Sequence, residues 1–325
     1  MDSPRPHPKA FELQAPDLSR WRVGNTGLEG VWRFESAHPG REVLVTALVH
    51  GNELCGAWAL VEALEAGVRP QRGALTLAFC NLAAFDRFDP QDTDRSRFVD
   101  QDLNRLWGAM PWRREGTSLN CEQQRVLQLQ PVVERADWLL DLHSMHAEGP
   151  PLGLTGLMSH HAAHAVAWGA PGLLVADAGH AAGTRMRDHG RFSQAHVEQA
   201  VALLVECGWH GAASSRTVAL DVLHRFLCAS GCTQADELPA VWHQPQPAQA
   251  PQQLLVTHAI TVQAGAQPRF TQEFRTGDVI EQQGTVIGHD GATDVTTPYD
   301  ACVLIMPSLA HAKPGATLVR LARPV

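Results

Sequence analysis

The sequence predicts an α/β protein with a mostly parallel central sheet, followed by a small all-β C-terminal domain. Two observations carry this prediction. Residues 42–80 alternate an apolar run, an amphipathic segment and a second apolar run, which is typical of a strand, helix and strand in a parallel sheet. A Pro/Gln-rich segment at 244–252 precedes short apolar runs separated by turn residues, as in a β domain. A chain of 325 residues is long enough for both.

The first apolar run, residues 42–50, ends at His50 and is followed by a glycine-containing turn. From Glu53 to Ala66 the apolar residues recur at helical spacing, so Glu53 opens a helix. His50 and Glu53 therefore flank one strand-to-helix turn, and both side chains are of types that bind zinc. The same spacing also fits a simpler arrangement, in which the helix dipole favours Glu53 and His50 makes an ordinary hydrogen bond.

Polar residues follow three later apolar runs: Asn81 after 74–80, His143 after 138–142, and Glu206 after 200–205. Sites in open α/β sheets lie beyond the carboxyl ends of the strands, so we expect these residues and His50 to gather at one edge. Asp141 precedes His143 by two positions and shares its face of the strand. Asp141 is therefore predicted to orient the imidazole of His143 through a hydrogen bond.

A long polar segment after Asn81 contains Arg97, Asn104 and Arg105. Long loops in compact domains are usually functional, and arginines bind carboxylates in a fork geometry or polarise carbonyl groups. A solvated charged loop is the alternative. The arginines at 185, 187 and 191 are a further candidate group for a substrate carboxylate, with a basic surface turn as the alternative.

We predict a main α/β domain over residues 1–243, a linker over 244–252 and an all-β domain over 253–325. Tyr299, the only tyrosine of the chain, lies in a predicted loop of the last domain. It is either a substrate-binding residue that reaches a carboxylate or an ordinary loop aromatic.

The charge of the chain argues against two classes of partner. The formal net charge is −8 and the isoelectric point is near 6.1, whereas nucleic acids and anionic membrane surfaces require a basic face. The N-terminus lacks the apolar segment of a signal peptide, and seven irregularly spaced cysteines make a poor disulfide framework. We therefore expect a cytoplasmic protein that binds neither nucleic acid nor a membrane. A homo-oligomer is compatible with the sequence.

Four ordered motifs resemble the aspartoacylase/succinylglutamate desuccinylase family, which is related to the zinc carboxypeptidases: His50-Gly51-Asn52-Glu53, Asp102-Leu103-Asn104-Arg105, Asp141-Leu142-His143-Ser144 and Val205-Glu206-Cys207-Gly208. The resemblance implies a zinc-carboxypeptidase-like catalytic domain over 1–243, with a C-terminal domain that borders the active site. It also implies one zinc ion per chain, held by His50, Glu53 and His143. By the same resemblance, Glu206 is the general base and acid, Arg97 polarises the scissile carbonyl, and Asn104 and Arg105 contact the substrate.

These expectations describe a zinc-dependent amidohydrolase that cleaves an N-acyl amino acid or a related small carboxylate, using metal-activated water and a glutamate base. A zinc metallocarboxypeptidase and an esterase acting on another small substrate use the same machinery and remain alternatives. A zinc-stabilised binding module without turnover is the non-enzymatic alternative. Glu206 argues against this last possibility, because a structural zinc normally has four protein ligands and needs no further acid.

Overall fold

The computed structural model describes residues 11–325 except 115, 170, 246–248, 266 and 311. The extreme N-terminus and part of the predicted linker therefore lie outside the described residues.

The main sheet is built from strands β1 (Val31–Glu35), β2 (Glu42–Ala47), β3 (Ala74–Phe79), β4 (Trp138–Met145), β5 (Leu152–Leu154), β6 (Leu173–Ala176), β7 (Val201–Trp209), β8 (Gln252–Thr261), β10 (Val279–Ile280), β13 (Cys302–Ile305) and β14 (Thr317–Pro324). These eleven strands lie in the order β1-β3-β2-β4-β7-β5-β6-β8-β14-β13-β10. A second sheet has the order β12-β11-β9 and consists of β9 (Pro268–Phe270), β11 (Val286–Asp290) and β12 (Thr293–Thr296).

The centre of the main sheet is parallel, as predicted, because β3, β2, β4 and β7 pair in parallel. β1 pairs antiparallel with β3 at the edge. β5, in contrast, runs antiparallel to β7, so the sheet as a whole is mixed. Only residues 146–151 connect β4 to β5, and so short a connection cannot return the chain to the other end of the sheet as a parallel crossover does.

The α-helices are α1 (Leu54–Glu65), α2 (Leu82–Phe85), α3 (Cys121–Arg135), α4 (Ser159–Trp168) and α5 (Ala213–Ala229). Short 3-10 helices are η1 (Thr93–Ser96), η2 (Leu103–Arg105), η3 (Met186–Asp188), η4 (Gly190–Ser193), η5 (Ala235–Glu237) and η6 (Ala240–Trp242).

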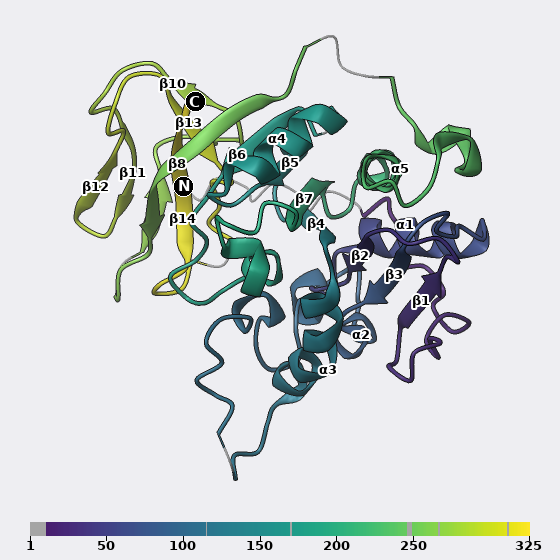
Figure 1. Cartoon of the computed structure of the whole chain (residues 1–325). Helices are drawn as coiled ribbons and strands as arrows, with labels where there is room; N and C mark the ends of the chain where they lie inside the picture. Colours follow the sequence, from purple (N-terminus) through teal and green to yellow (C-terminus); the bar gives the residue numbers. More distant parts are fainter. Residues whose placement is uncertain (1–10, 115, 170, 246–248, 266, 311) are drawn as a thin grey trace.

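Helices cover both faces of the central strands (Figure 1). Val43 and Val45 of β2 face the core that contains α1, α4 and α5, whereas Leu44 between them faces the core that contains α3. This alternation follows from the two-residue period of a strand. On β4 and β7, His143 and Glu206 lie on the same face as Leu139 and Ala202, which pack on the α3 side.

The C-terminal strands gather at the opposite end of the molecule from β1 and α1 (Figure 1). Four of them, β8, β10, β13 and β14, belong to the main sheet, and only β9, β11 and β12 form a separate one. β8 starts at Gln252, pairs in parallel with β6, and is followed in the sheet by β14, β13 and β10. The division into two domains at 244–252 stays a prediction. Strands from before and after this segment pair in one sheet, because β6 is hydrogen-bonded to β8.

All seven cysteines are unpaired, which agrees with their irregular spacing. Among the described residues, no helix is both long and apolar enough to cross a lipid bilayer.

Candidate metal centre and active-site cavity

His50 and Glu53 lie in the turn between β2 and α1. β2 ends at Ala47, and Leu48 then adopts a left-handed conformation with φ of 55°, which redirects the chain. Gly51 is required by close packing, since a Cβ there would lie 2.4 Å from the backbone of Ala84. Glu53 is the N-cap residue of α1, yet its side chain makes no capping hydrogen bond. Its carboxylate instead contacts His50 and His143.

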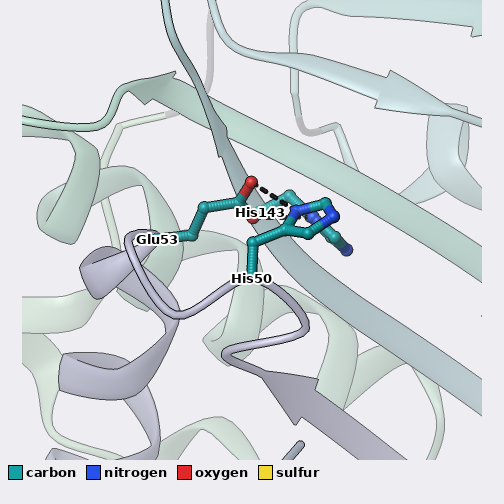
Figure 2. Close-up of side chains that lie close together, drawn as sticks. All are labelled: His50, Glu53 and His143. Atoms are coloured by element: carbon teal, nitrogen blue, oxygen red, sulfur yellow. Dashed lines mark hydrogen bonds and ion pairs between the residues drawn. The ribbon is translucent and has the colours of Figure 1, made fainter. Parts of the chain in front are cut away.

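Three buried side chains converge here (Figure 2). Glu53 Oε1 lies 2.7 Å from His50 Nδ1, and Glu53 Oε2 lies 2.7 Å from His143 Nδ1. One ligand atom from each of the three residues lies within 4.8 Å of the others, as a single bound ion would require. Burial would raise the pKa of Glu53, but His50 and His143 hold that pKa well below its ordinary value. His50, Glu53 and His143 therefore form a candidate metal site.

The Nδ1 atom of each imidazole faces Glu53, and the Nε2 atom faces a different carboxylate. His143 Nε2 lies 3.0 Å from Asp141 Oδ2, as predicted, and Asp141 also accepts a 2.7 Å hydrogen bond from Thr46. His50 Nε2 lies 2.9 Å from Asp102 Oδ1, a partner that we did not predict although Asp102 belongs to one of the four motifs. A carboxylate at Nε2 favours the tautomer whose Nδ1 lone pair is free to bind a metal.

We expect Asp141→Asn to lower zinc affinity by about 10- to 100-fold, because the amide holds the His143 tautomer less strongly than the carboxylate. Competition with a fluorescent chelator measures this. Asp236→Asn, the same change at an exposed position, is the control and should leave affinity unaltered. Equal affinities for wild type and Asp141→Asn would remove Asp141 from the site.

Glu206 lies beside the candidate metal ligands. It is the register partner of His143 on the neighbouring strand, so both side chains project from the same face of the sheet. Only 8% of Glu206 is exposed, and its Oε2 atom has no hydrogen-bond partner among the residues that the structure describes. Burial, reinforced by the charge of Glu53, raises the pKa of Glu206 to about 8.

The predicted end of the strand at Glu206 was wrong, since β7 continues to Trp209 and pairs there with β4.

Arg97 reaches the candidate metal ligands from the segment after β3. Its Nη2 atom lies 3.0 Å from Asp102 Oδ2 and 3.0 Å from His50 Nε2, and its Nη1 atom lies 3.8 Å from Glu53 Oε1. Asp102 is thus shared between Arg97 and His50. Arg97 and Glu53 keep opposite charges, because Asp102 and Glu53 raise the pKa of Arg97 against the effect of its burial.

Asn104 and Arg105 follow on η2. The Asn104 side-chain oxygen accepts a 2.8 Å hydrogen bond from the backbone N–H of Met186, so this group also holds η3 in place. Arg105 Nη2 lies 3.7 Å from Asp102. Burial lowers the pKa of Arg105 to about 10, with added repulsion from Arg97, Arg320 and Arg185.

The loop that carries Arg97 and Asp102 is anchored by Glu122, which the sequence analysis missed. This residue is fully buried in the first turn of α3. Its carboxylate accepts hydrogen bonds of 2.6, 3.0 and 3.1 Å from the backbone N–H groups of residues 99, 100 and 101. It also accepts a 3.0 Å bond from the Asn81 side chain. Asn81 was expected at the site but instead belongs to this anchor and is not among the cavity-lining residues.

A cavity of about 510 Å³ opens over His50, Glu53 and His143. This volume is typical of sites for small molecules. The predicted residues that line it are His50, Glu53, Arg97, Asn104, Arg105, His143 and Glu206. Tyr299 is not among the lining residues; its hydroxyl lies 2.7 Å from Thr257 Oγ1 on β8.

The comparison with protein families decides the assignment. Residues 39–208, just over half of the chain, match the succinylglutamate desuccinylase/aspartoacylase catalytic domain. The chain belongs to this family. The resemblance inferred from the four motifs is thereby confirmed. A search of curated proteins finds no match.

Solved structures of this desuccinylase/aspartoacylase family have the same fold. The succinylglutamate desuccinylase of Vibrio parahaemolyticus is 16% identical with a TM-score of 0.64, covering 91% of this chain and 86% of that one. A succinylglutamate desuccinylase/aspartoacylase of Rhodobacter sphaeroides is 18% identical with a TM-score of 0.64, covering 91% and 88%. The product-bound ectoine utilization protein EutE (DoeB) of Ruegeria pomeroyi is 17% identical with a TM-score of 0.61, covering 90% and 87%. Such low identities show the fold alone.

Of the three arginines considered at 185–191, the structure brings only Arg185 to the cavity. Arg187 is fully buried and donates to backbone carbonyls, and Arg191 pairs with Asp137 at 3.0 Å. Two further lining residues, His180 and Arg320, were missed. Arg320 comes from β14, outside the family match, and nothing local in its sequence distinguishes it from a surface arginine.

Proposed function

We propose that this member of the desuccinylase/aspartoacylase family is a zinc-dependent hydrolase that cleaves the amide bond of an N-acyl amino acid or a related small carboxylate. The observation that carries the proposal is the buried His50, Glu53 and His143 group with Glu206 beside it, at the base of a small-molecule-sized cavity.

The residues present fit a zinc ion. Two neutral imidazole nitrogens and one carboxylate are a common ligand set of catalytic zinc, and each imidazole has the carboxylate partner that such ligands usually have. A bound zinc would polarise the substrate carbonyl and make water more acidic, to a pKa of about 7.

The remaining steps belong to the side chains of the chain. Glu206, once ionised, accepts a proton from the attacking water and then delivers it to the departing amine. Arg97 donates hydrogen bonds to the oxygen that develops negative charge in the transition state. Arg105 lines the same cavity and supplies a cation for the carboxylate of the amino acid.

The test is zinc content of the purified protein, together with hydrolysis of a panel of N-acyl amino acids before and after chelation. We expect one zinc per chain, loss of activity on its removal, and recovery on its return. His50→Ala and His143→Ala should lose metal and activity together, whereas His196→Ala, at an exposed position, should keep both. Absence of bound metal under zinc-replete conditions would contradict the proposal.

A further inference from the structure

We propose that His146 is a positioning residue that holds Arg97 in the orientation needed to polarise the scissile carbonyl. The inference rests on the proposed function, because Arg97 has this task only if the cavity is a hydrolase site. His146 directly follows the end of β4 and lies three residues beyond His143. It lines the cavity together with Arg97 and Asp94.

The two terminal nitrogens of Arg97 have different partners. Its Nη2 atom lies 3.0 Å from Asp102 Oδ2 and 3.0 Å from His50 Nε2. A guanidinium held at one nitrogen can still rotate about that contact, so a second contact is needed to fix its plane. The Nη1 atom makes this contact by donating a 3.4 Å hydrogen bond to His146 Nε2. Because Nη1 carries two N–H groups, the bond to His146 leaves the other one for a substrate oxygen.

The segment that carries Arg97 offers the same imidazole a second partner. Asp94 lies in η1, Arg97 is the C-cap residue of η1, and the backbone N–H of Arg97 donates a 3.1 Å hydrogen bond to the carbonyl of Asp94. Side chains three positions apart on a 3-10 helix lie on the same side. Asp94 Oδ1 lies 3.5 Å from His146 Nδ1, whereas Arg97 contacts Nε2. One imidazole therefore spans two side chains of the same turn.

These contacts define the tautomer of His146. A guanidinium can only donate hydrogen bonds, so Nε2 is the acceptor and the proton of the neutral ring is on Nδ1. The Nδ1 atom faces the carboxylate of Asp94, which can only accept. Each ring nitrogen of His146 therefore suits the group that it faces.

His210 packs against the ring of His146 and limits its rotation. The two rings are T-shaped, with centroids 4.6 Å apart and planes at 77°. His210 follows the end of β7, is 2% exposed, and has its Nδ1 atom 2.7 Å from Ser144 Oγ. Burial lowers the pKa of His210 to about 4, so this ring is neutral and does not repel Arg97. Packing and hydrogen bonds together hold the imidazole of His146.

The effect of His146 is expected mainly in kcat. Arg97 acts on charge that develops in the transition state, so a misoriented guanidinium lowers kcat more than it changes KM. Loss of a hydrogen bond to a charged group corresponds to about 10- to 100-fold in rate. A residue that only filled space in the cavity wall would show no dependence on a hydrogen-bond acceptor.

His146→Phe and His146→Gln separate the hydrogen bond from the ring packing. Phenylalanine keeps a ring against His210 but has no acceptor, whereas the glutamine side chain can present an oxygen to Arg97. With the zinc-loaded full chain and the best N-acyl amino acid of the panel, we expect His146→Phe to lower kcat by about 10- to 100-fold and to leave KM within about threefold of the wild type. His146→Gln should retain at least about a third of kcat.

His196→Phe, the same change at an exposed position, is the control and should match the wild type. Melting temperature and zinc content show whether each variant is folded and loaded. Equal kcat for His146→Phe and His146→Gln would overturn the proposal, because the acceptor would then have no effect.

The loss must also depend on Arg97. In an Arg97→Met background, we expect His146→Phe to change kcat by less than about twofold, because the group that His146 positions is absent. A further loss as large as that in the wild-type background would show that His146 acts by another route and would exclude the positioning role.

Nuclear magnetic resonance separates this inference from the proposed function. The nitrogen chemical shifts of the His146 ring, assigned by their loss in His146→Gln, report its tautomer without turnover. We expect the Nδ1–H tautomer in the wild type and a displaced Nε2 resonance in Arg97→Met. If no N-acyl amino acid is hydrolysed, the proposed function fails, whereas these shifts still support the contact between His146 and Arg97. A proton on Nε2, or an Nε2 resonance that is unchanged in Arg97→Met, overturns the inference.

Discussion

Glu206→Gln is expected to retain zinc and lose nearly all turnover, with kcat lowered by about 10²- to 10⁴-fold. Glutamine preserves the shape of the side chain but cannot accept a proton from water or return one to the amine. None of the three candidate metal ligands is altered by the change. Zinc content and steady-state kinetics measure the two effects separately. Activity close to that of the wild type would exclude Glu206 from the mechanism.

Glu206→Gln is expected to lower turnover but to raise stability at high pH. The stability change tests the buried position of Glu206 independently of catalysis. Because the pKa of Glu206 in the folded chain is about 8, above its ordinary value, the protonated form is favoured in the folded state. The cost of ionising it grows as the pH rises from the unfolded value through about 8. In metal-free protein, Glu206→Gln should therefore raise the melting temperature relative to wild type at pH 9 and have little effect at pH 4. The reverse trend would contradict the buried position of this carboxyl.

Glu122→Gln is expected to destabilise the protein by about 3–5 kcal/mol and to lower kcat/KM although residue 122 is not among the cavity-lining residues. An amide replaces one of two oxygens that each accept two hydrogen bonds, so its NH₂ group faces two N–H donors. The loop carrying Arg97 and Asp102 loses its anchor. Thermal unfolding and kinetics measure the effects.

Glu134→Gln provides the control for Glu122, since it is the same chemical change on the exposed side of α3. Its effect on stability should stay within about 0.5 kcal/mol. If Glu122 only stabilised the fold, kcat/KM per folded molecule would be unchanged at temperatures well below unfolding. Retention of full activity there would refute a positioning role for Glu122.

The grouping of His50, Glu53 and His143 was predictable because local patterns determine most of it. His50 and Glu53 lie in one strand-to-helix turn. Asp141 and His143 occupy alternate positions of one strand, so both pairs are close together in the sequence. The end of β7 was misjudged for a physical reason. The apolar run stops at Glu206 because the cavity replaces the core on that face, while the backbone continues to pair with its neighbours.

Other features depend on contacts between distant parts of the chain. Glu122 resembles an ordinary acidic residue in the first turn of a helix, and only the folded chain brings the backbone of residues 99–101 to it. For Tyr299 the sequence left open a substrate-binding role and an ordinary loop aromatic, and in the structure it packs against the C-terminal core with its hydroxyl 2.7 Å from Thr257 Oγ1. The residues next to Glu122 and Tyr299 in the sequence do not indicate either set of contacts.

The pairing of β6 with β8 has a consequence for any shortened form of the protein. A fragment ending before Gln252 would leave β6 as an outer strand with unpaired N–H and C=O groups along one side. Such an open edge can recruit strands from other molecules and promote aggregation. The segment that matches the family therefore depends on its C-terminal neighbour for colloidal stability as well as for part of its cavity wall.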